Sequence, residues 1–301
     1  GFLGGLDDYI KVFRHNKEGL KGRFKIVGQV GLGIIVGTTM WLSPQIIVRE
    51  KVTQPVQTVY LNPDGSVIES VQRNVVLSSE STKTTKTTIP FVKNNEFDYG
   101  WLTGETSAAT WLLYVLVAIF VVTAVSNGAN LTDGLDGLAI LPAVMCFMVY
   151  AIFIYVAGHA SFAQYLQVPA VPGVGEVTVL CCALMGAGLG FLWFNCFPAQ
   201  VFMGDVGSLS LGGVLGFLAV LCKQELILVV AGGVFVMETV SVIMQVGFFK
   251  ATHGRRLFRM TPLHHHFQKG DHPLPESKII VRFWIISVLL AIISLSVLKL
   301  R

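Results

Sequence analysis

Residues 108–128 read AATWLLYVLVAIFVVTAVSNG, an apolar stretch without a single charged side chain. About 20 apolar residues in a helix cross the hydrocarbon core of a bilayer, so this stretch predicts a transmembrane helix. Six further windows meet or approach that length: 26–44, 138–157, 176–194, 207–222, 226–249 and 279–298. The composition agrees, because 53% of the 301 residues are hydrophobic and only 13% are charged. We therefore expect an all-α, multi-pass membrane protein with seven full spans.

The N-terminal residues predict the end of one more helix. Gly1-Phe-Leu-Gly-Gly-Leu6 reads as the tail of an eighth span whose start precedes this sequence, which begins with Gly instead of Met. Residues 1–301 are then one membrane-embedded domain that is incomplete at its N-terminus. The net charge of +4 is small and spread out, and no basic stripe with interleaved aromatic residues is present. This pattern excludes a nucleic-acid partner.

Two loops rich in Lys and Arg, 11–25 and 250–278, predict the orientation in the membrane. Short basic loops stay in the cytoplasm. Alternation through the predicted spans then places 45–105 outside and places 129–137 and 195–206 inside. Every polar motif described below falls on the cytoplasmic face.

The outer segment 45–105 predicts a small β-hairpin around the turn-forming Asn62-Pro-Asp-Gly65. Its Ser/Thr/Lys-rich tail, Ser78 to Thr88, predicts a flexible loop. Small residues at four-residue spacing, Gly186/Gly190 and Gly212/Gly216, predict close helix–helix packing.

Carboxylates gather at the ends of the apolar stretches, where each is costly: insertion scales give about 2.5–3.5 kcal/mol for a charge at a helix centre. Asp7 and Asp8 are adjacent, so on a helix they point about 100° apart and we expect them to have different roles. Asp133 and Asp136 share one side if their segment is helical, and a loop before a helix cap is the alternative. Several carboxylates at one surface repel each other unless they share a cation.

Asp205 precedes Gly207-Ser208 at the start of a predicted span, where a helix N-terminus offers free N–H groups to phosphate oxygens. Hard carboxylate ligands suit Mg²⁺ bound together with substrate phosphates. Asp205 is therefore the predicted Mg²⁺ ligand.

His264, His265 and His266 are consecutive in a basic loop. Zinc is the alternative ligand, but three consecutive side chains diverge and are badly placed to bind one ion together. Contacts with an anionic diphosphate are favoured. Glu238 lies inside the predicted span 226–249, where it either has a buried, hydrogen-bonded structural role or faces the substrate.

Four motifs resemble those of the polyprenyl-phosphate N-acetylhexosamine-1-phosphate transferases. They are Asp7-Asp8-Tyr9, Asn130-Leu-Thr-Asp-Gly-Leu-Asp-Gly137, Phe194-Asn195-x-x-Pro198-Ala199 with Phe202-Met-Gly-Asp205-Val-Gly-Ser208, and Thr261-Pro-Leu-His-His-His266-Phe267. They cover nearly the whole chain in the family's order, and the last resembles the branch that transfers phospho-MurNAc-pentapeptide. The chain departs from the pattern in lacking the family's first two spans, with the substrate-contacting loop between them, and in Gln268, where the family has Glu.

The resemblance implies a ten-span enzyme of the bacterial inner membrane, often a homodimer. It would use Mg²⁺ to transfer phospho-MurNAc-pentapeptide from UDP-MurNAc-pentapeptide to undecaprenyl phosphate, which yields UMP and the lipid I of peptidoglycan synthesis. On the family pattern, Asp7 or Asp8 orients or deprotonates the lipid phosphate and the three histidines contact the diphosphate. The substrate-binding candidates are Asn130, Asp133, Gly134, Leu135, Asp136, Asn195 and Phe202, of which Phe202 can stack on the base.

The sequence leaves two alternative functions open. A sister transferase would use another UDP-amino sugar or acceptor lipid. An ion-coupled transporter would carry its charges near the bilayer midplane in broken helices and would show repeats between its halves. Here the charges lie at one surface and no repeat is found, which favours the transferase. Because a phosphate with a second pKa near 6 is ionised at neutral pH, direct attack is favoured over a covalent Asp–phosphate intermediate.

Overall fold

The computed structural model describes residues 1–301 except 14–21, 62–66, 93–95, 105–106, 270–271 and 300–301. Within this part, seven helices are long and apolar enough to cross a membrane, which confirms the predicted number of spans. They are α2 (Gly22–Leu42), α4 (Ala108–Thr132), α5 (Ile140–Gly158), α7 (Val177–Asn195), α8 (Gly204–Leu221), α10 (Gly233–Ala251) and α12 (Glu276–Ser296). The shorter helices are α1 (Phe2–Phe13), α3 (Gly100–Thr103), α6 (Ala160–Tyr165), the 3₁₀ turn η1 (Val174–Glu176), α9 (Glu225–Ala231) and α11 (Leu263–Gln268).

The core of the bundle lies around α5, whose side chains are apolar on every face. Phe147, Tyr150 and Phe153 are each at most 2% exposed, and α5 packs against α7, α8 and α12. A helix that is hydrophobic all round lies in the core of a large protein or spans a membrane, and α5 has 72% of its spanning window buried. The Tyr150 hydroxyl avoids an unpaired polar group by donating to the carbonyl oxygen of Gln224, 2.9 Å away.

Helices α2, α4 and α8 approach closely through glycines. A Cβ on Gly212 would lie 2.6 Å from the Val125 carbonyl oxygen, and a Cβ on Gly216 would lie 2.8 Å from Val122 Cα, so this predicted packing pair is confirmed. The prediction for Gly186 and Gly190 is wrong within this chain, because a Cβ at either position on α7 would meet nothing described within 4 Å. Their face of α7 lies on the outside of the bundle.

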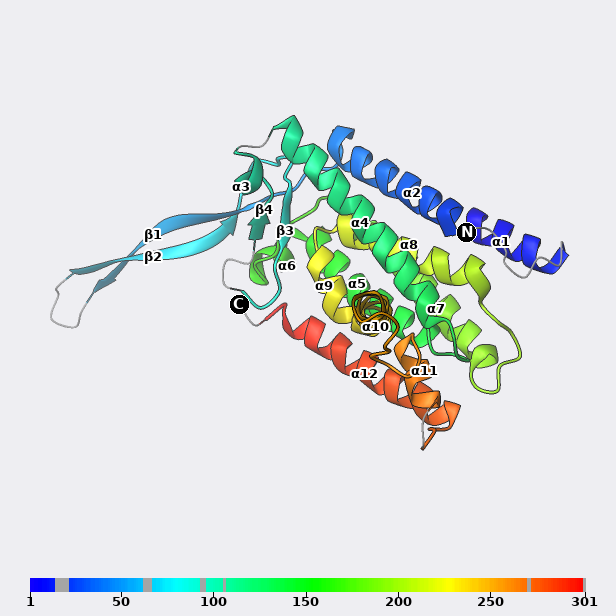
Figure 1. The fold of residues 1–301 in the computed structure, drawn as a ribbon. Coiled ribbons are helices and arrows are strands. Elements are labelled where there is room, and N and C mark those ends of the chain that lie inside the picture. The colour runs from blue at the N-terminus through cyan, green and yellow to red at the C-terminus, as the bar shows by residue number, and fades with distance from the viewer. Residues whose placement is uncertain (14–21, 62–66, 93–95, 105–106, 270–271, 300–301) are drawn as a thin grey trace.

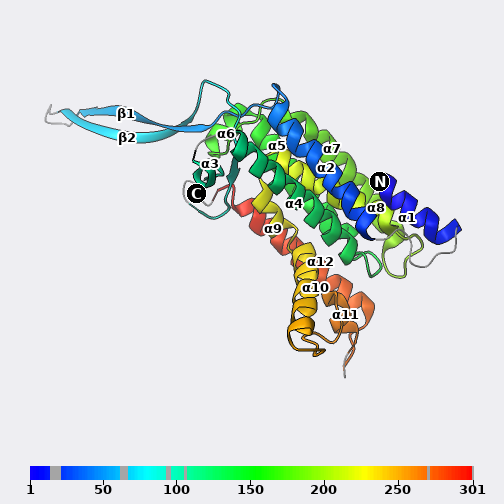
Figure 2. The same ribbon diagram turned by 45° about the horizontal axis from the view of Figure 1, so that its top comes forward.

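The predicted span 226–249 is broken into two helices. Helix α9 ends at Ala231 and α10 begins at Gly233, so Gly232 alone separates them. Glycine weakens a helix interior, and a Cβ on Gly232 would lie only 2.8 Å from the Leu228 carbonyl oxygen. Helix α10 is seen end-on in Figure 1, while α4 and α12 run across the view, and it leans away from the bundle in Figure 2.

The predicted β-hairpin is confirmed. Strands β1 (Lys51–Leu61) and β2 (Val67–Leu77) pair antiparallel from Lys51 opposite Leu77 to Leu61 opposite Val67. They extend as an arm from the end of the bundle in both views. The predicted turn at 62–65 lies outside the described residues. A second small sheet pairs β3 (Lys86–Thr88) with β4 (Glu96–Asp98).

The flexible loop predicted for Ser78–Thr88 is wrong, because its threonines pack against the junction of α8 and α9. The Thr87 hydroxyl donates to the buried carboxylate of Glu225, and Gln224 Nε2 donates to Thr88 Oγ1 at 3.0 Å. The backbone N–H of Thr88 donates to the Lys223 carbonyl oxygen at 3.1 Å. Buried polar groups need partners, and these threonines supply them.

Candidate active site

Helices α1 and α8 bring Asp7, Asp8 and Asp205 together at one end of the bundle. Each can offer a carboxylate oxygen, and these oxygens lie within 4.8 Å of one another. The close approach depends on Gly4, because a Cβ there would collide with the backbone of Asp205 and Val206. Asp205 lies in the first turn of α8, as predicted. The aspartates lie within helix α1, which continues to Phe13, instead of at a helix end.

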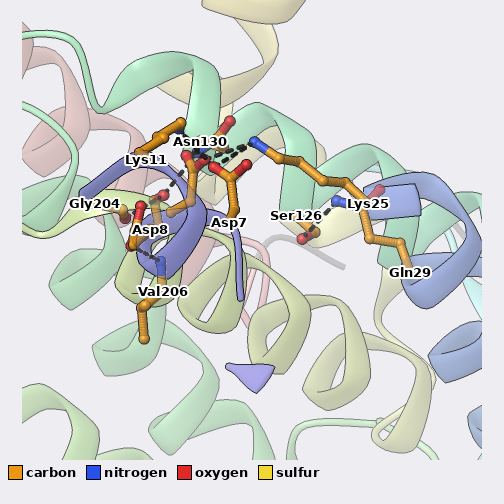
Figure 3. A network of polar contacts seen from close by, with 11 residues as sticks. Asp7, Asp8, Lys11, Lys25, Gln29, Ser126, Asn130, Gly204 and Val206 are labelled. Atoms are coloured by element: carbon orange, nitrogen blue, oxygen red, sulfur yellow. Dashed lines mark hydrogen bonds and ion pairs between the residues drawn. The ribbon is translucent and has the colours of Figure 1, made fainter. Parts of the chain in front are cut away.

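Two lysines that the sequence places in a basic loop lie instead on helices and bind this cluster. Lys11 Nζ is 2.6 Å from Asp7 Oδ2 and 2.8 Å from Asp205 Oδ2. Lys25 Nζ, from α2, is 3.0 Å and 2.6 Å from the same two oxygens. Figure 3 shows the lysines approaching the carboxylates from two sides. Three carboxylates and two ammonium groups leave one net negative charge when all are ionised.

Lys11 stays charged in this setting. Burial by itself lowers the pKa of an ammonium group, but hydrogen bonds and charges from Asp205 and Asp7 outweigh it and raise the pKa of Lys11 well above its ordinary value. The cluster therefore has a permanent cationic component. The other predicted members of the basic loop 11–25 that fall within 14–21 lie outside the described residues.

Asp7 and Asp8 have different partners, as expected for adjacent helix positions. Asp7 is fully buried in the lysine cluster. Asp8 is partly exposed, and its Oδ2 accepts the backbone N–H of Val206 at 3.1 Å. Gly204 has φ +61°, and a Cβ on it would lie 2.9 Å from Asp8 Oδ2. Asp8 therefore joins α1 to the first turn of α8, where helix N–H groups are free.

The end of α4 supplies a further contact. Asn130 Nδ2 donates to Asp205 Oδ1 at 2.5 Å and lies 2.9 Å from Ser208 Oγ. The predicted candidates Asn130 and Asp205 are thus brought together, whereas Lys11, Lys25 and Ser208 were missed. The i, i+4 spacing of Asp7 and Lys11 is a signal that could have found Lys11. Lys25 and Ser208 had no such signal, because their partners are distant in sequence.

The segment after α4 is a turn, so Asp133 and Asp136 do not share a helix face. Asp133 caps the C-terminal end of α4. Burial, followed by the nearby charges of Asp205 and Asp8, raises the pKa of Asp133 from 3.8 to about 6. The charges of the cluster therefore act on the Asp133 carboxyl group, although Lys11 and Lys25 form no described hydrogen bond with it.

The turn is held against the loop that follows α7. Asp136 Oδ2 accepts the N–H of Ala199 at 2.9 Å, and Asn195 Oδ1 accepts the N–H of Gly137 at 3.1 Å. Asn195 Nδ2 donates to the Val201 carbonyl oxygen at 2.7 Å, and the side chain is buried. Both the oxygen and the nitrogen of the Asn195 side-chain amide therefore form hydrogen bonds with backbone groups. Asn195 therefore fixes two motifs relative to each other.

Of the other predicted substrate-binding residues, Phe202 is 73% exposed and Leu135 is buried. Gly134 lies against the Nε2 edge of the His264 ring, because a Cβ on Gly134 would collide with Nε2.

The three histidines lie on the short helix α11 and have separate environments. His264 is buried next to Glu238. His265 Nδ1 is 2.6 Å from Gln268 Oε1, and His266 Nδ1 accepts the backbone N–H of Arg259 at 3.2 Å. The prediction that the three side chains diverge is wrong for the first pair, because the rings of His264 and His265 pack against each other with their centroids 4.2 Å apart.

A bundle of membrane-spanning helices with acidic, basic and amide side chains converging at one end defines a membrane-embedded enzyme site. The model of glycosyl transferase family 4 matches residues 1–223. Phospho-N-acetylmuramoyl-pentapeptide-transferases of three bacteria align with the whole of this chain. The proteins of Parabacteroides distasonis and Flavobacterium psychrophilum are each 47% identical to it, with 74% and 73% of their lengths covered. The protein of Amoebophilus asiaticus is 48% identical, with 73% covered.

The chain therefore belongs to glycosyl transferase family 4, as one of its phospho-N-acetylmuramoyl-pentapeptide-transferases. It is a multi-pass membrane enzyme. The expectation drawn from the four motifs is confirmed at the level of the family.

Proposed function

We propose that this enzyme transfers phospho-MurNAc-pentapeptide from UDP-MurNAc-pentapeptide to undecaprenyl phosphate with Mg²⁺, and so forms lipid I and UMP. The observation that carries the proposal is the convergence of Asp7, Asp8 and Asp205 with two lysines at one end of the bundle. The names of the relatives support the choice of donor. The enzyme then works as one domain, 1–301, in the bacterial inner membrane, with its site facing the cytoplasm, and as a homodimer. Its product serves cell-wall synthesis, and through it cell shape and division.

The residues present fit a magnesium ion. All three acidic groups offer hard oxygen atoms, which Mg²⁺ prefers, and together with the lysines they leave a net negative charge. Asp205 is the proposed principal ligand, because its partners come from three helices: Lys11 on α1, Lys25 on α2 and Asn130 on α4. When bound, the ion would neutralise charge on the diphosphate.

The lysines and aspartates have separate proposed tasks in the transfer. An oxygen of the lipid phosphate attacks the phosphorus that carries the sugar, the bond from that phosphorus to UMP breaks, and UMP leaves with the electron pair. Lys11 and Lys25 attract both anionic reactants into the same space. Asp7 lies among these charges and can orient the acceptor phosphate, whereas Asp8 fixes the start of α8. Direct attack needs no strong base, since the acceptor is already ionised at neutral pH.

The turn 133–137 and the loop around Phe202 are the proposed site for the nucleotide. The exposed ring of Phe202 can stack on uracil, and Gly134 allows a ligand to approach the backbone. Asp133, Leu135 and Asp136 shape the same turn. Asn195 contributes by holding this turn, and His264 of α11 packs against its Gly134.

An apolar cavity suits the lipid acceptor. It has a volume of about 400 Å³, lies between α4, α9 and α10, and includes Phe120, Phe235 and Val236 in its wall. The break at Gly232 turns α10 away from the bundle beside this space. A polyprenyl chain is the proposed occupant, because burial of its CH₂ groups is favourable by about 0.8 kcal/mol each.

The decisive experiment supplies the purified enzyme in liposomes with Mg²⁺, undecaprenyl phosphate and a panel of UDP-amino sugars. We expect UMP and a lipid-linked product with UDP-MurNAc-pentapeptide, at a rate far above that with UDP-GlcNAc. Val236→Trp, which fills the cavity, should raise the KM for undecaprenyl phosphate and leave UMP binding unchanged. Faster transfer from a UDP-amino sugar without the peptide would refute the proposed donor.

A further inference from the structure

Glu238 is a buried acidic residue that the proposed chemistry does not yet use. It lies on α10, and its side chain is fully buried. Its carboxylate contacts one residue from two directions: Oε1 is 3.2 Å from His264 Nδ1, and the backbone N–H of His264 lies 3.2 Å from Oε1 and 3.4 Å from Oε2. A buried carboxylate is kept only where a partner compensates its lost hydration. Its partner here is a member of the histidine motif.

The opposite edge of the His264 ring faces the nucleotide turn. His264 is buried, and neither ring nitrogen forms a hydrogen bond among the described residues: Nδ1 has only the ion-pair contact with Glu238 Oε1 at 3.2 Å, and Nε2 has neither. That atom packs on Gly134, where a Cβ would collide with it. A polar atom that is buried without a protein partner points to a ligand. The position of Gly134 in the Asn130–Gly137 motif links this ring edge to the proposed donor site.

The neighbouring histidines lack this arrangement. His265 pairs with Gln268, and His266 accepts a backbone N–H from the loop before α11. Among these three described histidines, His264 is the one whose Nδ1 lies at ion-pair distance from a carboxylate while its Nε2 has no hydrogen-bond partner in the described part of the chain.

We propose that Glu238 is a positioning residue that holds the His264 ring by Nδ1 and so directs Nε2 toward the anionic part of the donor nucleotide. A carboxylate behind an imidazole keeps the proton on the near nitrogen and fixes the ring orientation. His264 is then the histidine that touches the donor, and His265 and His266 support α11. This inference rests on the proposed donor site at Gly134.

The test is a double-mutant cycle of Glu238→Gln and His264→Ala, measured in two assays. One assay gives kcat and KM for transfer from UDP-MurNAc-pentapeptide. The other gives the affinities for UDP and for uridine, which lacks phosphates. Ser241→Ala is the matched control, because its hydroxyl lies one turn along α10 and donates only to the Glu238 backbone carbonyl among the contacts described. Thermal unfolding of each variant reports folding.

We expect Glu238→Gln to lower kcat/KM and UDP affinity by about 10–100-fold, as for other residues that orient a functional imidazole. Uridine affinity and thermal stability should change little. In the His264→Ala background the same substitution should have no further effect, and Ser241→Ala should behave as the wild type. A Glu238→Gln effect that persists undiminished without His264, or that lowers uridine affinity equally, would overturn the positioning role.

Failure of the proposed function gives a different result. If the wild type transfers nothing from UDP-MurNAc-pentapeptide, the donor assignment is wrong, but coupling between Glu238 and His264 in UDP affinity still tests the positioning role. If Glu238→Gln does not fold, Glu238→Asp serves instead: its shorter side chain keeps the charge, and UDP affinity should again fall only when His264 is present.

Discussion

Replacing Asp133 by Asn should stabilise the protein at neutral pH. Burial, and then the charges of Asp205 and Asp8, raise the pKa of this carboxyl group from 3.8 to about 6. The folded protein therefore binds a proton that the unfolded chain releases between these two pH values. Stability falls as the pH rises through this window and stays lower above it. Asn has the same shape and never ionises, so it avoids this loss.

The magnitude follows from the two pKa values. Roughly 1.4 kcal/mol corresponds to each pKa unit, so the free energy of unfolding should rise by up to about 3 kcal/mol at pH 7.5 in Asp133→Asn. The gain should shrink as the pH is lowered toward 4.5. Mg²⁺ at the neighbouring carboxylates would offset the charges that act on Asp133, so the gain should also be smaller in Mg²⁺.

Thermal unfolding of the detergent-solubilised protein across pH 4.5–8, with and without Mg²⁺, measures this effect. Glu176→Gln is the control, because this carboxylate is exposed and its loss should change stability by less than about 0.5 kcal/mol. A stability gain for Asp133→Asn that is independent of pH would refute the electrostatic reasoning. A gain unaltered by Mg²⁺ would argue that no cation binds beside Asp8 and Asp205.

Three further substitutions test the site and the fold. Asp205→Asn should leave folding intact and lower transfer by several orders of magnitude in Mg²⁺, and near-normal turnover would move the metal to other carboxylates. Phe202→Ala should weaken UMP binding by about 1–3 kcal/mol in calorimetric titration if its ring stacks on uracil; unchanged affinity would contradict stacking. Thr87→Val should lower the free energy of unfolding by about 1–3 kcal/mol, because Glu225 loses a hydrogen-bond partner. Thr38→Val is the control and should not lower it, because the Thr38 hydroxyl donates only to carbonyl oxygens of its own helix.

The membrane spans could be predicted from the sequence because they depend on local properties. A run of about 20 apolar residues is sufficient to predict a spanning helix, and seven such helices are present. The β-hairpin was equally local, since its two strands flank a turn-forming segment. The position of Asp205 in the first turn of α8 also followed from the residues beside it.

Only some of the residues of the site could be predicted from the sequence. The aspartates and Asn130 stand out as polar residues next to apolar runs, which made them candidates. Lys25 does not stand out, because its 2.6 Å contact with Asp205 joins positions 180 residues apart. Asn195 looked like a ligand-binding residue, but its amide is used by the backbone of Gly137 and Val201.

Only the tertiary structure decided which polar groups compensate one another. The composition of Ser78–Thr88 predicts a flexible loop, but in the structure its threonines form hydrogen bonds with Gln224 and Glu225. Glu238 likewise could have been structural or substrate-facing until the structure placed His264 beside it. Hydrophobic length fixes where a helix crosses the membrane, because it acts within one segment. The pairing of buried charges is settled by the packing of segments that are distant in sequence, since each charge needs a partner wherever the fold supplies one.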